Sequence, residues 1–389
     1  MNSAGLCYLV FRRASTRIRI VPSSWCSDAE SKGTRLASFS ALHSFHPYPC
    51  KFPESVAREH LSSGKVVLDP YCGSGTTLLE AAISGNSVIG MDCNPIALLI
   101  TRAKLINVGA PLTAAVKEVK RTLSAASLSP IQITHDLPEF AGRDHWFSPT
   151  ARREFGLITY AIGQFSRDSD EWVALAAVVS SIVTRFSNQD SETRYASVEK
   201  AIQPGAILKT YLKRLSDFVA SLDVRGPLKI KSQVFEEDFG TQTQIPEGIV
   251  DQVVTSPPYA NTMDYYLYHK QRMNLLGFNF KDAQHREIGS RHEYSSQKQS
   301  SLKWNTDLKN GLTQCYKVLR HGGTATYIIG DSQIAGMKLD AGKMVCDLAK
   351  EVGFDSQILK SEPMSGKSRL FSKAFQAPNK FEHTILLIK

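Results

Sequence analysis

Two short segments of the sequence combine residue types that could bind a ligand and hold a reacting group. The first, DPYCGSGTT at 69–77, places a carboxylate and two glycines directly after an apolar run. The second, SPPY at 256–259, places a hydroxyl, two prolines and an aromatic ring after another apolar run. Ligands of open α/β sheets bind beyond the carboxyl ends of the strands. Both segments are therefore candidates for one site.

The first segment favours a ligand that carries a positive charge and a ribose. Gly73 and Gly75 lack a Cβ, so a ligand can lie against the backbone there. No lysine follows the turn, as a phosphate-binding loop would require, and Asp69 would repel an anion but attract an ammonium. Asp92 ends the next apolar run, where a carboxylate can accept hydrogen bonds from a ribose. These features describe S-adenosylmethionine, although the two aspartates could instead cap helices.

The second segment fits a nucleic-acid base that has left its stack. The exocyclic amine of such a base can donate to the hydroxyl of Ser256 and to the carbonyl of Pro257. Proline has no N–H and a fixed φ, so this carbonyl is aimed without competing backbone pairing. Tyr259 offers a face on which the base can stack. A turn of this composition is common by itself, and it gains weight from its pairing with the first segment.

The elements around these segments predict an α/β fold with a parallel sheet covered by helices. Gly85 should end the helix after the first strand, while Asn94 and Pro95 begin a second helix that Gly109 should end. Residues 111–229 hold helical periods and no convincing strand, so we expect a helical insertion there. The predicted strands span 65–70, 87–92, 230–238, 249–256, 323–332 and 381–389.

Composition narrows the class of protein and of partner. The net charge of +9 suits a polyanion, because Lys and Arg release counterions from phosphates, although an ordinary basic surface would give the same number. The seven cysteines form no C-x-x-C pair, which favours a reducing cytoplasm and gives no metal-ligand spacing. The apolar run at 173–183 is too short to span a membrane.

Three further segments carry weaker signals. The start of the chain, with four arginines before its first acid, is typical of a transit peptide, of a disordered basic extension or of an upstream start codon. Residues 281–303 are polar without a helical period and could form a solvated loop or a lid that faces DNA. Most of the four rings at Tyr265, Tyr266, Tyr268 and His269 should pack in the core.

The motifs together resemble those of the DNA amino-methyltransferases, which methylate cytosine at N4 or adenine at N6. Their cofactor loop is similar to DPYCGSGTT, and their catalytic motif is Ser/Asp/Asn-Pro-Pro-Tyr/Phe/Trp. FHPYPCKFPESVA at 45–57 resembles their third cofactor-contacting segment. The runs TSPPYANTMDYYLYHKQRMNLLGF, EIGSR and VLRHGGTATYIIGDS resemble a subgroup of site-specific DNA methyltransferases. The resemblance covers residues 43–108 and 230–389.

This resemblance implies a Rossmann-like, seven-stranded methyltransferase sheet with a mainly helical insertion. It implies a catalytic domain at 41–110 and 230–389, an insertion at 111–229 that could recognise the target, and a basic, disordered extension at 1–40. S-adenosylmethionine would be the methyl donor, and no metal is needed for direct transfer to an amine. The implied cofactor contacts are Asp69, Gly73, Gly75, Thr76, Asp92, Asp238 and Lys51, and the implied catalytic residues are Ser256, Pro257, Pro258 and Tyr259.

The resemblance also indicates the base and the partners. Serine in the first motif position is more common in cytosine-N4 enzymes and aspartate in adenine-N6 enzymes, so Ser256 favours cytosine N4. The alternatives are adenine N6, an RNA guanine-N2 methyltransferase with an Asn-Pro-Pro-Tyr loop, and a catalytically inactive DNA-binding module. The expected partner is double-stranded DNA, and a cognate restriction endonuclease could complete a cytoplasmic restriction-modification pair.

Overall fold

A seven-stranded sheet forms the frame of the molecule, in the order β10-β11-β7-β6-β1-β2-β5. The computed structural model describes residues 40–51, 53–128, 133–241, 243–295, 300–334, 337–364 and 380–389. Strands β5, β2, β1, β6 and β7 run parallel, and β11 is antiparallel to both β7 and β10. The predicted seven-stranded α/β fold is thus confirmed. The strands are β1 (Val66–Asp69), β2 (Ser87–Asp92), β5 (Ser232–Glu236), β6 (Val250–Thr255), β7 (Leu319–Gly330), β10 (Asp355–Pro363) and β11 (Phe381–Ile388).

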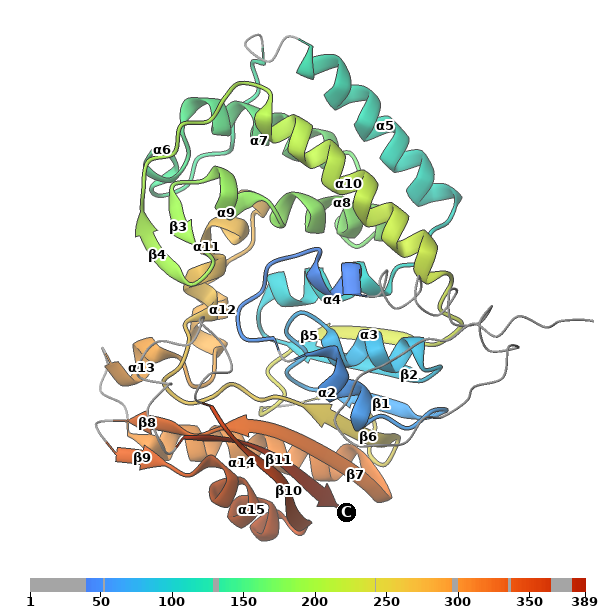
Figure 1. Ribbon diagram of the computed structural model, residues 1–389, viewed down its shortest axis with the longest axis vertical. Helices are drawn as coiled ribbons and strands as arrows, with labels where there is room; N and C mark the ends of the chain where they lie inside the picture. The colour runs from blue at the N-terminus through green and yellow to red at the C-terminus, as the bar shows by residue number, and fades with distance from the viewer. Residues whose placement is uncertain are drawn as a thin grey trace, which may run out of the picture.

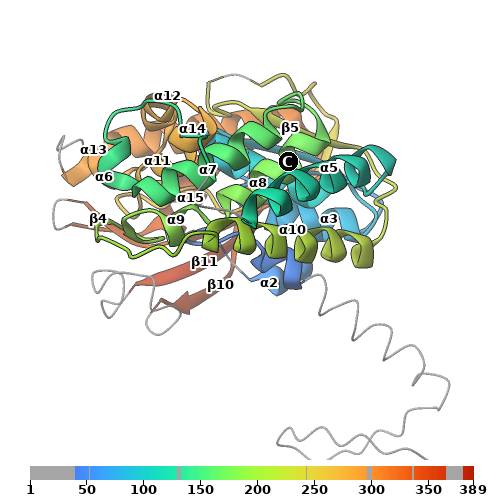
Figure 2. The same ribbon diagram turned by 90° about the horizontal axis from the view of Figure 1, so that it is seen from above.

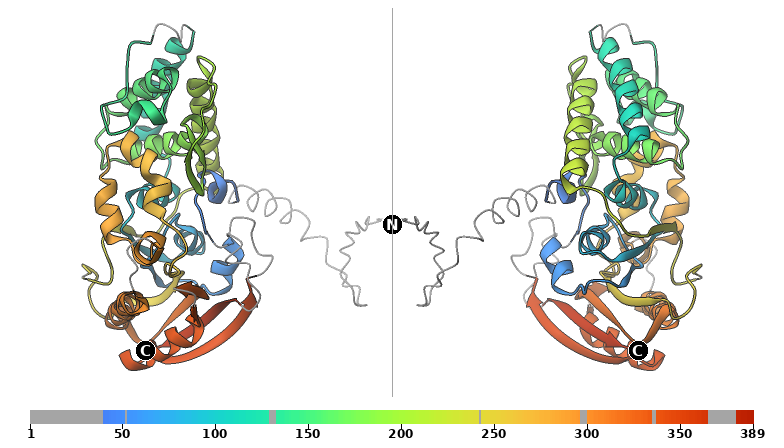
Figure 3. Two further views of the ribbon diagram at one scale, coloured as in Figure 1. Left: turned by 90° about the vertical axis from the view of Figure 1, so that its left-hand side faces the viewer. Right: turned by 90° about the vertical axis from the view of Figure 1, so that its right-hand side faces the viewer.

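Helices cover both faces of the sheet and form a separate layer at one end (Figure 1). In the side views the helices α5 to α10 again lie beyond the sheet, at the end away from β10 and β11 (Figure 3). The helices are α2 (Glu54–Glu59), α3 (Thr76–Ile83), α4 (Pro95–Leu105), α5 (Ala110–Ser127), α6 (Arg143–Trp146), α7 (Pro149–Ile162), α8 (Asp170–Ser180), α9 (Val183–Phe186), α10 (Ala206–Arg225), α11 (Tyr265–Leu276), α12 (Phe280–Arg286), α13 (Arg291–Ser295), α14 (Ser301–Val318) and α15 (Ala341–Val352).

The two faces of the central strands are both buried. Val67 and Val88 pack in one cluster with side chains of α3 and α4. Their neighbours Leu68 and Ile89 point the other way and pack with side chains of α14 and α15. Burial on both faces explains why these strands read as continuous apolar runs rather than as alternating ones.

The predicted end of the second helix at Gly109 is wrong. Helix α4 ends at Leu105, and Gly109 instead precedes the first residue of α5. The guanidinium of Arg225, at the end of α10, donates to the carbonyls of Lys104 and Ile106 at 2.5 and 2.6 Å. A side chain from 120 residues further along the sequence thus satisfies carbonyls that a glycine cap was expected to satisfy.

The insertion is mainly helical, as expected, but the prediction that it holds no strand is wrong. Strands β3 (Gln189–Ser191) and β4 (Arg194–Ser197) form a short antiparallel hairpin. They have three and four residues and no alternation of burial, so no periodic signal marks them. The view from above shows the insertion helices α5, α8 and α10 in front of the central strands (Figure 2).

Two other predictions near the site also fail. Residues 281–303, expected to lack helical structure, contain most of α12, all of α13 and the start of α14, and residues 296–299 lie outside the described part. Strand β10 was missed because eight of its nine residues are exposed at the sheet edge, which gives no apolar pattern. The predicted extension at 1–40 lies outside the described residues except for its last one.

Within the described residues, no single helix is long and apolar enough to cross a membrane. The bent pair α4 and α5 meets the length and composition test only when the two helices are taken together. Ten of the eleven residues of α4 are buried, as expected of a core helix.

A buried carboxylate in the insertion gives a test of its stability. Glu154 of α7 accepts the N–H groups of Gly205, Ile207 and Leu208 at 2.6, 3.0 and 3.1 Å, at the start of α10. We expect Glu154→Ala to lower the free energy of unfolding by about 3 kcal/mol, because buried donors lose a charged acceptor. Urea denaturation measures this change. The exposed Glu118→Ala should leave stability unchanged, and an equal loss in both variants would contradict the prediction.

Candidate active site

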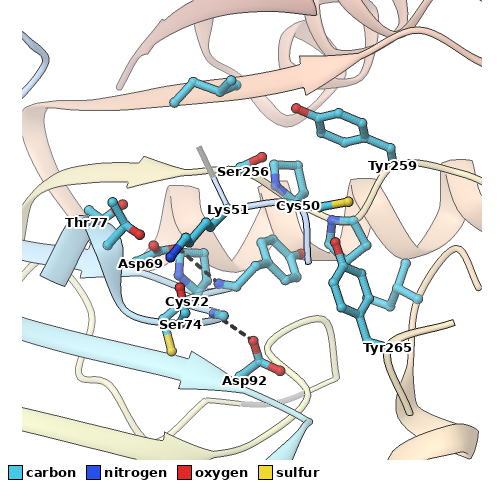
Figure 4. Close-up of a pocket in the computed structure, with 18 of the residues that line it drawn as sticks. Cys50, Lys51, Asp69, Cys72, Ser74, Thr77, Asp92, Ser256, Tyr259 and Tyr265 are labelled. Atoms are coloured by element: carbon cyan, nitrogen blue, oxygen red, sulfur yellow. Dashed lines mark hydrogen bonds between the residues drawn. The ribbon is translucent and has the colours of Figure 1, made fainter. Parts of the chain in front are cut away.

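Four neighbouring parallel strands end at one edge of the sheet and bring the candidate residues together. Asp69 and Asp92 are the last residues of β1 and β2, Ser256 directly follows β6, and Asp238 lies two residues after β5. These residues line one cavity of about 760 Å³, within the range of small-molecule sites. Figure 4 shows Asp69, Asp92 and Ser256 around this cavity.

Ten of the eleven predicted site residues line this cavity, and Gly75 does not. The lining residues are Lys51, Asp69, Gly73, Thr76, Asp92, Asp238, Ser256, Pro257, Pro258 and Tyr259. Sequence reasoning therefore located the pocket, although the roles of these residues remain predictions.

The glycines of the loop between β1 and α3 make room for protein atoms. Gly75 has φ +73°, and a Cβ there would lie 2.6 Å from Oγ1 of Thr101. A Cβ on Gly73, at φ +50°, would lie 3.3 Å from a ring carbon of Tyr48. The missing Cβ atoms therefore leave room for Thr101 of α4 and for Tyr48, while the approach of a ligand to the backbone of Gly73 and Gly75 stays a prediction.

Hydrogen bonds hold the same loop from two sides. Asp92 accepts the N–H groups of Gly73 and Asn94, both at 2.9 Å. From α4, the Thr101 hydroxyl donates to the Gly73 carbonyl at 3.0 Å, and the Lys104 ammonium donates to the Ser74 carbonyl at 2.6 Å. Thr101 and Lys104 were not singled out from the sequence, because their role depends on how α4 crosses the loop.

The two aspartates are buried acids. Asp69 accepts from the Thr255 hydroxyl at 2.6 Å and from the Tyr71 N–H at 3.2 Å. Burial raises the pKa of Asp69 to about 6, and these hydrogen bonds oppose the rise. Burial likewise raises the pKa of Asp92 to about 6, against its backbone hydrogen bonds. A ligand that brings hydrogen-bond donors or positive charge would favour the ionised form of both.

The SPPY loop is fixed by residues from later parts of the chain. The Trp304 indole donates to the Pro258 carbonyl at 3.2 Å. The Asn261 N–H donates to the Gly289 carbonyl at 2.9 Å, and the Thr262 hydroxyl donates to the Tyr259 carbonyl. These contacts give the loop one conformation before any substrate arrives, which is what orienting catalysis requires.

Comparison with known proteins is consistent with this geometry. Residues 20–102 match a family described as DNA methylase. The chain is 25% identical over 251 residues to Type II methyltransferase M.MvaI of Kocuria varians, covering 58% of this chain and 55% of that protein. It is 40% identical over 68 residues to Type II methyltransferase M.MjaII of Methanocaldococcus jannaschii, covering 16% of this chain and 13% of that protein. In these regions the chain is similar to DNA amino-methyltransferases.

The extent of these matches is partial. This chain spans about half the length of the first relative and a smaller share of the second. A solved structure titled a putative DNA modification methylase, from Thermus thermophilus, aligns with 39% of this chain and 52% of its own. That alignment has 15% identity and a TM-score of 0.24. Geranyl diphosphate methyltransferase aligns over 86% of this chain and 77% of its own, with 8% identity and a TM-score of 0.36.

The residues around the cavity fit S-adenosylmethionine, the methyl donor of the amino-methyltransferase family. Asp69 and Asp92 supply carboxylates. Burial removes these groups from water, so their ionised forms are stabilised by a ligand that donates hydrogen bonds. Two other buried oxygens at the cavity, the hydroxyl of Ser74 and Oε2 of Glu237, have no hydrogen-bond partner among the described residues. Buried polar atoms are rarely unpaired, so these oxygens favour a polar ligand.

Sequence reasoning missed a stack of rings beside the family's cofactor loop. The Tyr48 ring stacks against Tyr265, with ring centroids 5.8 Å apart, and against His269, at 5.1 Å, with interplanar angles of 22° and 26°. Tyr266, Tyr268 and His269 are buried as predicted, whereas Tyr265 lines the cavity together with Tyr48. The signal that could have found Tyr48 is its place in the family's third cofactor segment.

His46 and Lys51, two other polar residues of the segment at 45–57, have different positions. His46 is buried and contacts the Ser180 hydroxyl at 2.9 Å and the Pro47 carbonyl at 2.7 Å, so it is structural. Lys51 lines the cavity, and its ammonium donates to the His43 carbonyl at 2.6 Å.

Gly75 and Gly85 form a matched pair that separates steric clash from backbone strain. Both have φ near +75° to +80°, but a Cβ on Gly85 would meet nothing within 4 Å. We expect Gly85→Ala to lower the free energy of unfolding by about 1–2 kcal/mol from backbone strain alone. Gly75→Ala should cost about 1–3 kcal/mol more, because its Cβ would displace Thr101. Equal losses in urea denaturation would show that the contact with α4 is unimportant.

Proposed function

We propose that this chain transfers a methyl group from S-adenosylmethionine to the exocyclic amine of a flipped-out base in DNA, with cytosine N4 as the acceptor. The observation that carries the proposal is the shared cavity. It is lined by the carboxylates after β1 and β2 and by the SPPY loop after β6. One cavity can therefore hold a donor and an acceptor side by side (Figure 4).

The cofactor half of the cavity would bind the donor by charge and hydrogen bonding. Asp92 would accept from the ribose hydroxyls, and Asp69 would attract the ammonium. Thr76 lies at the N-terminus of α3, where backbone N–H groups favour a carboxylate, and Lys51 adds positive charge at the same cavity. Asp238 would lie near the adenine. When bound, S-adenosylmethionine supplies an electrophilic methyl group on its sulfonium.

The base half of the cavity would orient the acceptor amine. Its two hydrogens would be accepted by the Ser256 hydroxyl and the Pro257 carbonyl, which turns the nitrogen lone pair toward the methyl group. The Pro258 carbonyl already accepts from Trp304, which supports Pro257 as the second acceptor. Tyr259 would stack on the base. The new N–C bond forms as the C–S bond breaks, and the extra proton leaves the alkylated amine for water.

The choice of cytosine N4 rests on Ser256 in the first position of the motif and on the family resemblance described above. A serine hydroxyl can accept from the amine and also donate to the adjacent ring nitrogen, N3 of cytosine or N1 of adenine. Adenine N6 is the alternative acceptor within the same mechanism. The intact set of cavity residues supports catalysis over an inactive DNA-binding module.

We also propose the wider setting of the reaction. The basic composition supports double-stranded DNA as the partner, and the Type II names of the relatives support a cognate restriction endonuclease. The five described cysteines are free, which supports a reducing cytoplasm. The insertion at 111–229 stands beside the catalytic sheet and would contribute to target recognition.

Nucleoside analysis tests the product. Unmethylated plasmid DNA incubated with the protein and S-adenosylmethionine should yield N4-methylcytosine on mass spectrometry after digestion. Tyr259→Ala should raise the activation free energy of methyl transfer by about 1–3 kcal/mol, the stacking energy that is lost, and leave cofactor affinity unchanged. N6-methyladenine would correct the base and keep the mechanism, while methylated RNA guanine with unmodified DNA would refute the DNA assignment.

The raised pKa of Asp92 predicts how cofactor affinity depends on pH. Ribose hydroxyls donate to the ionised carboxylate, whose pKa in the free protein is about 6. Affinity should therefore be constant well above pH 6 and fall as the pH drops through about 6, by up to tenfold per unit from Asp92 and by a further contribution from Asp69, whose pKa is also about 6. Calorimetry with S-adenosylmethionine between pH 5 and 8 measures this. Asp92→Ala should bind weakly at every pH, and a flat profile in the wild type would remove Asp92 from the cofactor site.

A further inference from the structure

The side chain of Tyr259 rests on two strands that come much later in the chain. Its hydroxyl donates to Oε1 of Glu382, on β11, at 3.0 Å. Gly330, the last residue of β7, is the direct cross-strand partner of Glu382 in the antiparallel pair. A Cβ on Gly330 would lie 2.7 and 2.9 Å from Cε2 and Cδ2 of the Tyr259 ring. The ring therefore lies where only glycine leaves space.

These two contacts restrain different motions of the ring. The hydroxyl lies on the axis about which the ring rotates, so its hydrogen bond fixes where the ring points but not its rotation. That rotation has a broad, roughly two-fold preference in tyrosine. Contact of one ring side with Gly330 restricts it. Together Gly330 and Glu382 fix the plane of the ring.

The strands that carry these two residues are themselves held together at this point. Asp331, next to Gly330, is buried and accepts from the Phe381 N–H at 3.1 Å and from His383 Nε2 at 3.2 Å. Phe381 and His383 flank Glu382 in β11. The backbone of Glu382, whose carboxylate accepts the hydrogen bond from Tyr259, therefore has a fixed position.

The phenol remains a donor throughout the physiological range. Burial and the nearby charge of Glu382 raise the pKa of Tyr259 well above its ordinary value. A phenol that donates to a carboxylate forms a charge-assisted hydrogen bond, which is stronger than a neutral one.

We propose that Gly330 and Glu382 are positioning residues that set the plane of Tyr259 before the base arrives. This inference rests on the proposed function, in which Tyr259 stacks on the flipped base. A ring already fixed in the stacking plane loses no rotational freedom when the base enters. A ring released from Glu382 would have to be ordered in each turnover, which lowers kcat and leaves cofactor binding unchanged.

Steady-state kinetics with unmethylated plasmid DNA and radiolabelled S-adenosylmethionine test the hydrogen bond. Tyr259→Phe and Glu382→Ala should each lower kcat about tenfold with an unchanged KM for the cofactor. The double variant should be no slower than Tyr259→Phe, because that variant already lacks the bond to Glu382. Glu382→Gln, whose amide oxygen still accepts, should restore most of the rate. Additive losses, or a Glu382→Gln variant as slow as Glu382→Ala, would overturn the proposal.

Two further variants separate positioning from general stability. Gly330→Ala should lower kcat at least as much as Glu382→Ala, since the ring must move out of its plane. Glu351→Ala is the matched control, because this exposed carboxylate pairs with Lys309 on the outer surface and should leave kcat unchanged. If thermal unfolding shifts in proportion to kcat across the series, the residues are merely structural and the proposal fails.

Carbon-13 NMR decides the contact without any turnover. With tyrosine labelled at Cζ, the Tyr259 resonance is assigned as the one lost in Tyr259→Phe. Glu382→Ala should shift that resonance, and Glu351→Ala should not. If the wild type methylates no DNA but Glu382→Ala shifts the Tyr259 resonance, the proposed function is refuted and the Tyr259–Glu382 contact is kept. If the wild type is active and Glu382→Ala leaves the resonance in place, only the positioning role is refuted.

Discussion

Helix α4 is buried on every side, and this single packing constraint connects the cofactor loop, the sheet and the insertion. Leu98 and Leu105 pack toward β1 and β2 with α3. Leu99 and Ile100 belong instead to the core that includes the insertion helices. From the same helix, Thr101 and Lys104 hold carbonyls of the glycine loop. Movement of α4 would therefore shift the loop and the insertion together.

The cavity is built from segments that are distant in sequence and rigid for separate reasons. Tyr48 precedes the first strand, packs on the glycine loop at Gly73 and stacks against Tyr265 and His269 of α11. Glu287 accepts the N–H groups of Tyr265 and Tyr266 at 2.8 Å, which fixes the start of α11. The ring stack thus ties the cofactor loop to the helix that follows the SPPY loop.

The site carries an electrostatic cost that a ligand can offset. Burial raises the pKa of Asp69 and Asp92 to about 6, above the value near 3.9 expected in an unfolded chain. The folded protein therefore retains protons that the unfolded chain releases between about pH 4 and 6. The stability that these groups contribute is complete below about pH 4 and is lost as the pH rises through about 6. Near neutral pH the cavity holds poorly solvated negative charge, which suits a cationic donor.

Local sequence determined the parts of this protein whose signals are local. The strands that end at Asp69, Asp92 and Thr255 are short apolar runs, each followed within three residues by proline, and their order along the chain placed the pocket at one edge of a parallel sheet. Asn94 capped α4 as predicted, since its side chain accepts the N–H of Ile96 two residues away at 3.0 Å. Features that depend on residues only a few positions apart can be predicted without knowledge of the fold.

Tertiary structure decided everything that depends on a partner far along the chain. Gly75 is required by Thr101, the end of α4 is set by Arg225, and the ring of Tyr259 is held by Glu382. No local sequence pattern marks the three partners, Thr101, Arg225 and Glu382. Their roles arise because a twisted sheet with crossover helices brings distant side chains within hydrogen-bonding distance, and no periodicity encodes that proximity.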